Sequence, residues 1–254
     1  MPRSTSGAGR GSMALRPFDP PPRAVLFDLD DTLCDYASAR RERLRLAFTL
    51  APDGEFRERE GIDLEAMIAE SIETQPHGAD HFLALFARYG INEIEQARAA
   101  ADWYRTNRFH GLAFFPEARD VLGAVRAWLS AMPGVSDRPL GVITNGPAEV
   151  QRAKIDLLGV ADLVDFALIS GELGVAKPEP AIFREALARA GVEAGEAVFV
   201  GDSVEHDMAG ARAAGIASVW VNRYGRAWPE SGWRACREVR SLHEVLALVG
   251  GSRV

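Results

Sequence analysis

The sequence predicts an α/β protein whose mainly parallel sheet is interrupted by an all-helical insertion. Two observations carry this prediction. From residue 113 onward, short apolar segments alternate with helical segments, which is the pattern of βαβ units. Between residues 37 and 112, apolar residues recur at three- and four-residue intervals, which is helical periodicity, and no strand is expected there. A chain of 254 residues is long enough for a core domain and a smaller insertion.

These patterns divide the chain into three parts. Residues 1–22 are rich in Gly, Ser, Pro and Arg and lack the apolar stretch of a secretory signal, so we expect a disordered N-terminal extension. Residues 23–36 and 113–254 are expected to form the α/β core. Residues 37–112 are expected to form a small helical domain that is inserted after the first strand.

The first expected strand is the apolar run Ala24-Val25-Leu26-Phe27, and the acidic segment Asp28-Leu29-Asp30-Asp31-Thr32 follows it directly. Side chains alternate between the two faces of a strand. Asp28 and Asp30 would therefore share one side where the strand ends, while Leu29 would turn back into the protein. Two carboxylates held this close repel each other, so such a site favours a bound cation or a shared proton.

Four helices are expected in the insertion, with Asp53-Gly54 and Pro76-His77-Gly78 as interruptions. Each is predicted from apolar positions that fall on one helical face. The four sets are Leu44/Ala47/Phe48, Leu64/Met67/Ile68/Ile72, Phe82/Leu85/Phe86/Tyr89 and Ile94/Ala97/Ala101/Tyr104.

In the rest of the core we expect a helix from Pro116, further helices from near Pro147, Glu179 and Glu205, and a closing helix over 241–249. The weak periodicity of 228–240 favours a loop. Buried strands are predicted at Leu140 to Thr144, Phe166 to Ser170, Ala197 to Val200 and Ala217 to Val221.

Composition excludes several classes of protein. No segment approaches the roughly 20 continuous apolar residues of a membrane span. The net charge of -7 argues against a general nucleic-acid surface, which needs a basic stripe. The two cysteines, Cys34 and Cys236, form neither a disulfide framework nor a metal-ligand spacing, so we expect a reduced, cytoplasmic protein. Only two of the 29 basic residues are lysine, Lys154 and Lys177, which makes each lysine more informative than usual.

Polar residues follow several of the expected strands. In an open parallel sheet the C-terminal ends of the strands line the ligand crevice, so these residues are expected to face one site. They are Asp28 and Asp30, then Thr144-Asn145-Gly146, then Lys177 before Pro178, and finally Gly201-Asp202-Ser203 with Asp207.

Carboxylates, a hydroxyl and an ammonium group at one site favour phosphate chemistry with magnesium. Hard oxygen ligands suit this ion, and Asp28 and Asp202 are the natural side-chain ligands. Lys177 and Thr144 would help to hold a phosphate dianion. Asp28 would attack phosphorus, and a neighbouring Asp30, kept protonated by its surroundings, would protonate the leaving oxygen.

In order and spacing these four motifs resemble those of the haloacid dehalogenase-like hydrolases, over roughly residues 23 to 225. The resemblance implies a Rossmann-like core, with an aspartyl-phosphate on Asp28 and with Asp30 as acid and then base. It implies Mg²⁺ held by Asp28, the backbone carbonyl of Asp30, and Asp202. The phosphate would be bound by Thr144, Asn145 and Lys177, with Thr32, Ser203 and Asp207 in supporting roles. The helical insertion resembles a cap that closes over small substrates.

Other polar residues are expected to lie outside the chemistry. Lys154 falls inside the helix that begins near Pro147, where a solvated helix face is the default. Cys34 has no thiolate partner and is expected to pack. The remaining expectations are that His77, His81 and His110 form no metal site and that Trp103, Tyr104 and Phe109 belong to the core of the cap.

The leading functional hypothesis is a magnesium-dependent phosphomonoesterase that acts on a small phosphorylated metabolite, as a monomer or homodimer. An acid at Asp30 favours phosphate esters over haloacids, and Asp31 in place of glycine resembles the nucleotidase and N-acylneuraminate-9-phosphatase branch. The alternatives are a phosphomutase, a 2-haloacid dehalogenase-type hydrolase, and a noncatalytic metabolite-binding module.

Overall fold

A computed structural model of the protein describes residues 18–51, 53–57, 60–74, 78–132, 138–230 and 232–250. Most of the extension that we expected to be disordered, residues 1–17, lies outside these ranges, as does Pro76-His77. Phe18, which we had placed in that extension, is anchored instead. Its backbone N–H donates to the carbonyl of Leu248 at 2.9 Å, and its side chain packs against the core.

In the described residues six strands form one sheet in the order β3-β2-β1-β4-β5-β6, and each pair of neighbours is parallel. This confirms the predicted α/β class. Because β1 lies between β2 and β4, the connections run in opposite directions on its two sides, and a crevice opens at the C-terminal ends of β1 and β4. The strands are β1 (Ala24–Phe27), β2 (Leu140–Thr144), β3 (Phe166–Ile169), β4 (Ala197–Gly201), β5 (Ala217–Val221) and β6 (Arg237–Val239).

The loop expected over residues 228–240 was wrong in part, because β6 lies within it. This edge strand spans only three residues, Arg237–Val239, and pairs with β5. Such a short strand shows too few alternations to be predicted from periodicity.

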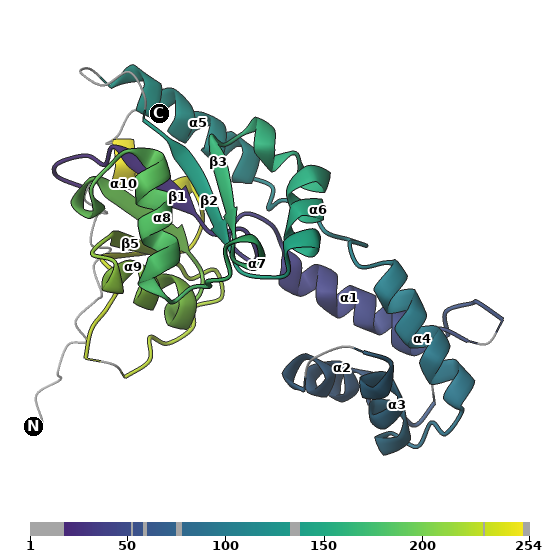
Figure 1. Cartoon of the computed structure of the whole chain (residues 1–254). Helices are drawn as coiled ribbons and strands as arrows, with labels where there is room; N and C mark the ends of the chain where they lie inside the picture. The colour runs from purple at the N-terminus through teal and green to yellow at the C-terminus, as the bar shows by residue number, and fades with distance from the viewer. Residues whose placement is uncertain are drawn as a thin grey trace, which may run out of the picture.

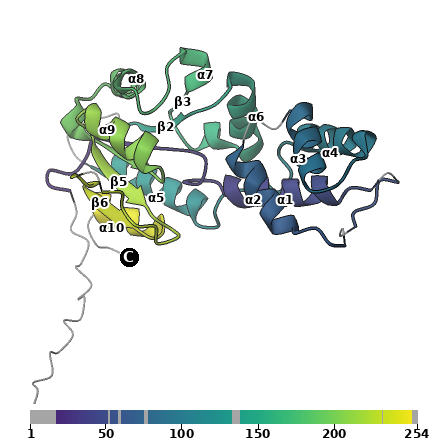
Figure 2. The same ribbon diagram turned by 90° about the horizontal axis from the view of Figure 1, so that it is seen from below.

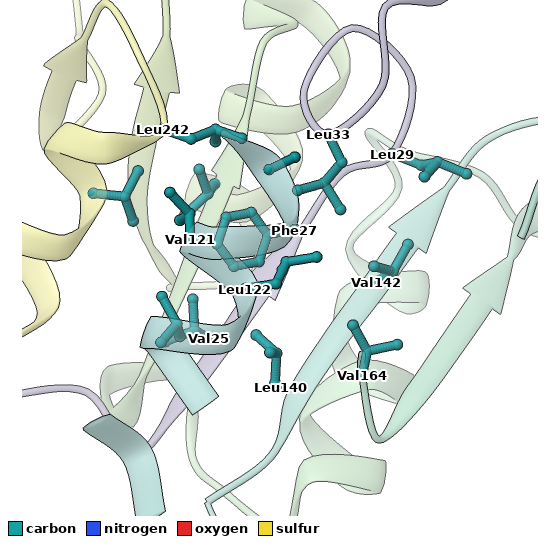
Figure 3. Close-up of a cluster of buried hydrophobic side chains, with 14 of the residues drawn as sticks. Val25, Phe27, Leu29, Leu33, Val121, Leu122, Leu140, Val142, Val164 and Leu242 are labelled. Atoms are coloured by element: carbon teal, nitrogen blue, oxygen red, sulfur yellow. The ribbon is translucent and has the colours of Figure 1, made fainter. Parts of the chain in front are cut away.

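Helices cover both faces of the sheet (Figure 1). Alternate residues of β1 supply the two cores: Val25 and Phe27 belong to one cluster, and Leu26 belongs to the other. The first cluster packs against α5 (Ala118–Ala131), α6 (Ala148–Leu158) and α10 (His243–Gly250), and Figure 3 shows α5 and Leu242 on this side. The second packs against α8 (Pro180–Ala190) and α9 (Ala209–Ala213), and the short α7 (Ser170–Leu173) follows β3.

The predicted starts of the core helices are close to the observed ones. Pro147 and Glu179 are the N-cap residues of α6 and α8. The helix expected near Glu205 begins as a π-helical turn, Val204–Met208, and continues into α9. Two 3₁₀ turns complete the core, at Val160–Asp162 and Ala194–Glu196.

The insertion is helical, as predicted, and forms a cap with a hydrophobic core of its own. Phe48 packs edge to face against Phe82, with ring centroids 5.5 Å apart, and against Phe86, at 5.8 Å. Tyr104 is buried in this cluster and Trp103 packs against it. The helices are α1 (Tyr36–Thr49), α2 (Leu64–Glu73), α3 (Ala79–Arg88) and α4 (Ile94–Thr106).

The cap extends from one side of the core, and α1 leads from the core into it (Figures 1 and 2). None of the helices in the described ranges has both the length and the apolar character that a membrane crossing requires.

Candidate active site

The segment after β1 brings Asp28 to the edge of the sheet and returns Leu29 to the core, as expected from alternation. Asp31 then adopts a left-handed backbone with φ of 62°. Aspartate tolerates this conformation better than most residues. Its side chain accepts a hydrogen bond from the backbone N–H of Ala37 at 2.7 Å, so the turn is fastened to the beginning of α1.

Lys177 lies at the centre of a buried network of charges. Its Nζ is 2.5 Å from Oδ1 of Asp28 and 2.7 Å from Oδ1 of Asp207, and its side chain is only 2% exposed. Burial opposes the charged ammonium, but the carboxylates of Asp207 and Asp28 outweigh this effect and raise the pKa of Lys177. The lysine is therefore a permanent cation beside Asp28.

Asn145, which we expected to bind phosphate, has its side chain engaged elsewhere. Its Nδ2 donates to the carbonyl of Lys177 at 2.8 Å, and its Oδ1 accepts from the N–H of Lys177 at 2.9 Å. The amide thus pairs with both backbone groups of the residue that supplies the ammonium. Its side chain positions Lys177, although Asn145 still lines the crevice.

The loop after β4 supplies the other carboxylates. Asp207 is buried, and its Oδ2 accepts a hydrogen bond from the N–H of Ser203 at 3.0 Å. Gly201 makes this possible, because a Cβ there would overlap the Asp207 carboxylate. Asp202 faces the crevice, and its Oδ2 is 3.0 Å from Nη2 of the more exposed Arg226.

These carboxylates form a group whose donor set fits magnesium. Oxygens of Asp28, Asp202 and Asp207 lie within 4.8 Å of one another. Burial raises the pKa of Asp28 well above its ordinary value; Lys177 counteracts this, while Asp207 and Asp202 add to it. Burial and then the charge of Asp207 raise the pKa of Asp202 to about 7. The raised pKa values of Asp28 and Asp202 indicate that this group of oxygen ligands is short of positive charge, which a divalent cation would supply.

Lys154 is not on a solvated helix face, so that expectation was wrong. Its side chain is 4% exposed, and its Nζ lies 2.8 Å from Oδ1 and 2.6 Å from Oδ2 of Asp30. Asp30 therefore contacts a buried cation that the sequence analysis had placed in solvent. The sequence did contain a signal: Gln151, Lys154 and the apolar residues Ile155 and Leu158 fall at helical spacing on the buried stripe of α6.

Gln151 is a second residue of the site that the sequence did not reveal. Its Nε2 donates to Oδ2 of Asp30 at 3.1 Å and also to the hydroxyl of Thr144. Gln151 thereby links the carboxylate after β1 to the hydroxyl at the end of β2. Nothing in the residue type alone distinguishes it from a surface glutamine.

The residues that were predicted after the strands come together in one crevice of about 130 Å³. Thr32 is the exception, since it is fully buried beneath the loop and its carbonyl accepts from Arg223 Nη2 at 3.3 Å. His206 also lines the crevice and was not predicted from the sequence. The complete lining is Asp28, Asp30, Thr144, Asn145, Lys177, Asp202, Ser203, His206 and Asp207.

Two negative expectations can be compared with the structure. Cys34 is buried in the core, and burial and then the charge of Asp30 raise the pKa of its thiol, which makes it a poor nucleophile. Within the described ranges, the one group of three potential metal ligands contains no histidine. His81 bonds with Ser71, at 2.9 Å between Nε2 and Oγ, and His110 packs against Trp103.

A parallel sheet with carboxylates after β1 and β4, a buried lysine and a helical cap defines a class: Rossmann-like hydrolases of phosphate esters. The model of the haloacid dehalogenase-like hydrolase family matches residues 22–215. The chain belongs to the haloacid dehalogenase-like hydrolases.

Similar proteins include several phosphatases. The chain is 33% identical over 207 residues to glyceraldehyde 3-phosphate phosphatase of Methanopyrus kandleri, covering 79% of this chain and 84% of that protein. It is 34% identical over 224 residues to phosphoserine phosphatase of Thermus thermophilus, covering 79% and 89%. A nucleotidase and an N-acylneuraminate-9-phosphatase also match. The predicted resemblance to these phosphatase members of the family is therefore confirmed. These relatives support phosphomonoester hydrolase activity.

The fold also matches solved structures of the family. The magnesium-bound hydrolase YfnB of Bacillus subtilis superposes with a TM-score of 0.69 at 21% identity, over 90% of this chain and 99% of that one. At this identity the likeness establishes the fold, and it confirms the Rossmann-like core with its helical cap.

Proposed function

We propose that the protein is a magnesium-dependent phosphomonoesterase that hydrolyses a small phosphorylated metabolite through a phosphoaspartate on Asp28. The observation that carries this proposal is the buried Asp28–Lys177–Asp207 network beside Asp202 at the edge of the sheet. It places a carboxylate nucleophile and a permanent cation in one crevice with Thr144.

In the first step, a carboxylate oxygen of Asp28 attacks phosphorus and the ester P–O bond breaks. Asp30 takes up a proton when the substrate binds and passes it to the leaving oxygen, so the product is a neutral alcohol. The ammonium of Lys177 and the hydroxyl of Thr144 bind the phosphoryl oxygens, and their charge and orientation favour the transition state.

In the second step, the carboxylate of Asp30 removes a proton from a water molecule, and the water oxygen attacks phosphorus. The bond between phosphorus and Asp28 breaks, and inorganic phosphate leaves. The contact of Lys154 with both oxygens of Asp30, at 2.8 and 2.6 Å, suits this step because it orients the carboxylate. Asp30 thus passes one proton to the leaving group in the first step and gains one from water in the second. It releases this proton to solvent as phosphate leaves, which restores the resting carboxylate.

A magnesium ion held by Asp28, Asp202 and the backbone carbonyl of Asp30 would supply positive charge that offsets the charge of the phosphate. Asp207 holds Lys177 in place and is held by the N–H of Ser203. Thr32 supports the loop that carries Asp30, since its carbonyl binds Arg223.

The names of the phosphatase relatives support a small phosphate ester as substrate, among them glyceraldehyde 3-phosphate and phosphoserine. The crevice, at about 130 Å³, suits a phosphate group, with the remainder of the substrate facing the cap. The cytoplasmic location and the monomeric or homodimeric state stay predictions.

Phosphate release from sugar phosphates, nucleotides and short phosphorylated acids, with Mg²⁺ and then with EDTA, tests the proposal. We expect release from at least one ester, loss with EDTA and recovery with excess Mg²⁺. Asp28→Asn should lower kcat by at least about 10³-fold because it removes the nucleophile. The matched control is Asp156→Asn, on the exposed side of α6, which should leave kcat unchanged.

Activity that survives EDTA or Asp28→Asn would contradict the proposal. Chloride release from 2-chloropropionate without phosphatase activity would favour the haloacid alternative.

A further inference from the structure

Three hydrogen bonds from α6 fix the carboxylate of Asp30. Lys154 contacts both oxygens, at 2.8 and 2.6 Å, and Gln151 donates to Oδ2 at 3.1 Å. Residues 151 and 154 are three apart and share one helical face. The orientation of Asp30 is therefore set by a helix that lies outside its own loop.

Lys154 also contacts the first residue of the helix that leads into the cap. Its Nζ lies 3.8 Å from the centroid of the Tyr36 ring, a distance at which a cation and an aromatic face attract each other. Tyr36 is the first residue of α1, the helix that leads from the core into the cap (Figure 1). The buried ammonium of Lys154 thus contacts both the carboxylate of Asp30 and the first residue of the helix that leads into the cap.

The two lysines of the chain differ in what they reach. Lys177 lines the crevice, whereas Lys154 does not, although its partner Asp30 does. Lys154 is therefore placed to act on the reaction through Asp30 and not through contact with the phosphate.

We propose that Lys154 is a positioning residue that holds Asp30 for its two proton transfers and, through Tyr36, ties the orientation of that carboxylate to the position of the cap. This inference rests on the proposed function of Asp30. It assigns to Lys154 and Tyr36 a task that the four sequence motifs do not include.

A double-mutant cycle tests the first part. We expect Lys154→Met to lower kcat by about 10- to 100-fold, since a small misplacement of a catalytic group has this effect, and to change KM less than about threefold. Lys154→Arg should recover part of kcat because it keeps a cation. In the Asp30→Asn background, Lys154→Met should have no further effect. The matched control is Arg152→Met on the same helix, which removes only an exposed ion pair with Glu172.

The second part is tested at Tyr36. Tyr36→Leu removes the aromatic face and should lower kcat several-fold in the wild type but not in Lys154→Met. Tyr36→Phe keeps the face and should stay within about twofold of the wild type. Thermal unfolding of every variant identifies any that do not fold, and Lys154→Arg and Tyr36→Leu carry the test if Lys154→Met is among them.

The inference would be overturned if Lys154→Met and Asp30→Asn lowered kcat independently, so that their fold-losses multiplied in the double variant. It would also be overturned if the kcat of Lys154→Met stayed within twofold of the wild type. A crystal structure distinguishes failure of the positioning role of Lys154 from failure of the proposed phosphatase function. In Lys154→Met we expect the Asp30 carboxylate to rotate, and in Lys154→Arg we expect it to rotate less. An unchanged orientation refutes the positioning role even if the wild type is no phosphatase.

Discussion

Asp202→Asn should stabilise the metal-free protein at high pH while it abolishes stabilisation by Mg²⁺. The pKa of Asp202 is raised to about 7 in the folded protein, from an ordinary value of 3.8, by burial and by the charge of Asp207. A folded protein that holds this proton more tightly than the unfolded chain is favoured at low pH, and the advantage is lost as pH rises through about 7.

The size of the effect follows from the two pKa values. The difference between about 7 and 3.8 corresponds to about 4 kcal/mol of free energy of unfolding, at about 1.4 kcal/mol per tenfold change in proton affinity. Roughly 3 kcal/mol of it falls between pH 5 and pH 8. Asparagine cannot ionise, so the variant escapes this loss. The broken ion pair with Arg226 costs little, because that arginine side chain is 52% exposed.

Urea unfolding in EDTA at pH 5 and pH 8, followed by circular dichroism, measures this prediction. The free energy of unfolding of Asp202→Asn minus that of the wild type should rise by roughly 3 kcal/mol between the two pH values. Contributions of asparagine that do not depend on pH cancel in this comparison. A difference that is the same at both pH values would refute the raised pKa of Asp202. Added Mg²⁺ should stabilise the wild type, by about 2.7 kcal/mol at one hundred times its Kd, and leave the variant unchanged.

Two further substitutions test the charge network around Asp28. Lys177→Met leaves the carboxylates of Asp28 and Asp207 buried without their cation, so we expect a loss of about 3–5 kcal/mol in urea unfolding and of almost all phosphatase activity; wild-type stability would contradict the network. Gly201→Ala places a methyl group against the Asp207 carboxylate and should cost about 1–3 kcal/mol and weaken Mg²⁺ binding in calorimetry, whereas the control Gly195→Ala, which meets no neighbouring atom, should do neither.

The sheet and the residues at its C-terminal edge were predictable from local sequence. Each buried strand is a short apolar run, and the topology of a parallel sheet places the polar residue that follows it at the crevice. A run such as Leu140–Thr144 is buried on both faces, and the polar residue that ends it must face the crevice. Lys154 was not predicted, because a residue inside a helix is placed by the packing of that helix. Its position on the stripe with Ile155 was visible, but the carboxylate that permits its burial lies 124 residues away in sequence.

Asn145 shows a different reason for an incomplete prediction. An asparagine at this position after β2 can either bind a phosphate or hydrogen-bond to a neighbouring backbone segment. Only the approach of the Lys177 backbone from the loop before α8 decides between them, and that approach is a property of the folded chain. Order and spacing therefore locate a site, while the partner of each polar atom depends on contacts between distant segments.

The pairing of charges also explains where a metal ion is needed. Lys177 is committed to Asp28 and Asp207, and Lys154 is committed to Asp30. Each ammonium therefore offsets carboxylates that are already present, and neither leaves a full positive charge for an incoming phosphate dianion.

Asp202 is the carboxyl group of the crevice without a lysine, and its contact with Arg226 leaves its pKa raised to about 7. Near neutral pH the metal-free site therefore reduces its negative charge by retaining a proton there. A divalent cation that displaces this proton brings two positive charges in place of one, and it does so beside Asp28. Because the lysines cannot provide that change, tight binding of the phosphate group should follow metal binding, and the same group, Asp202, should set the pH below which both are lost.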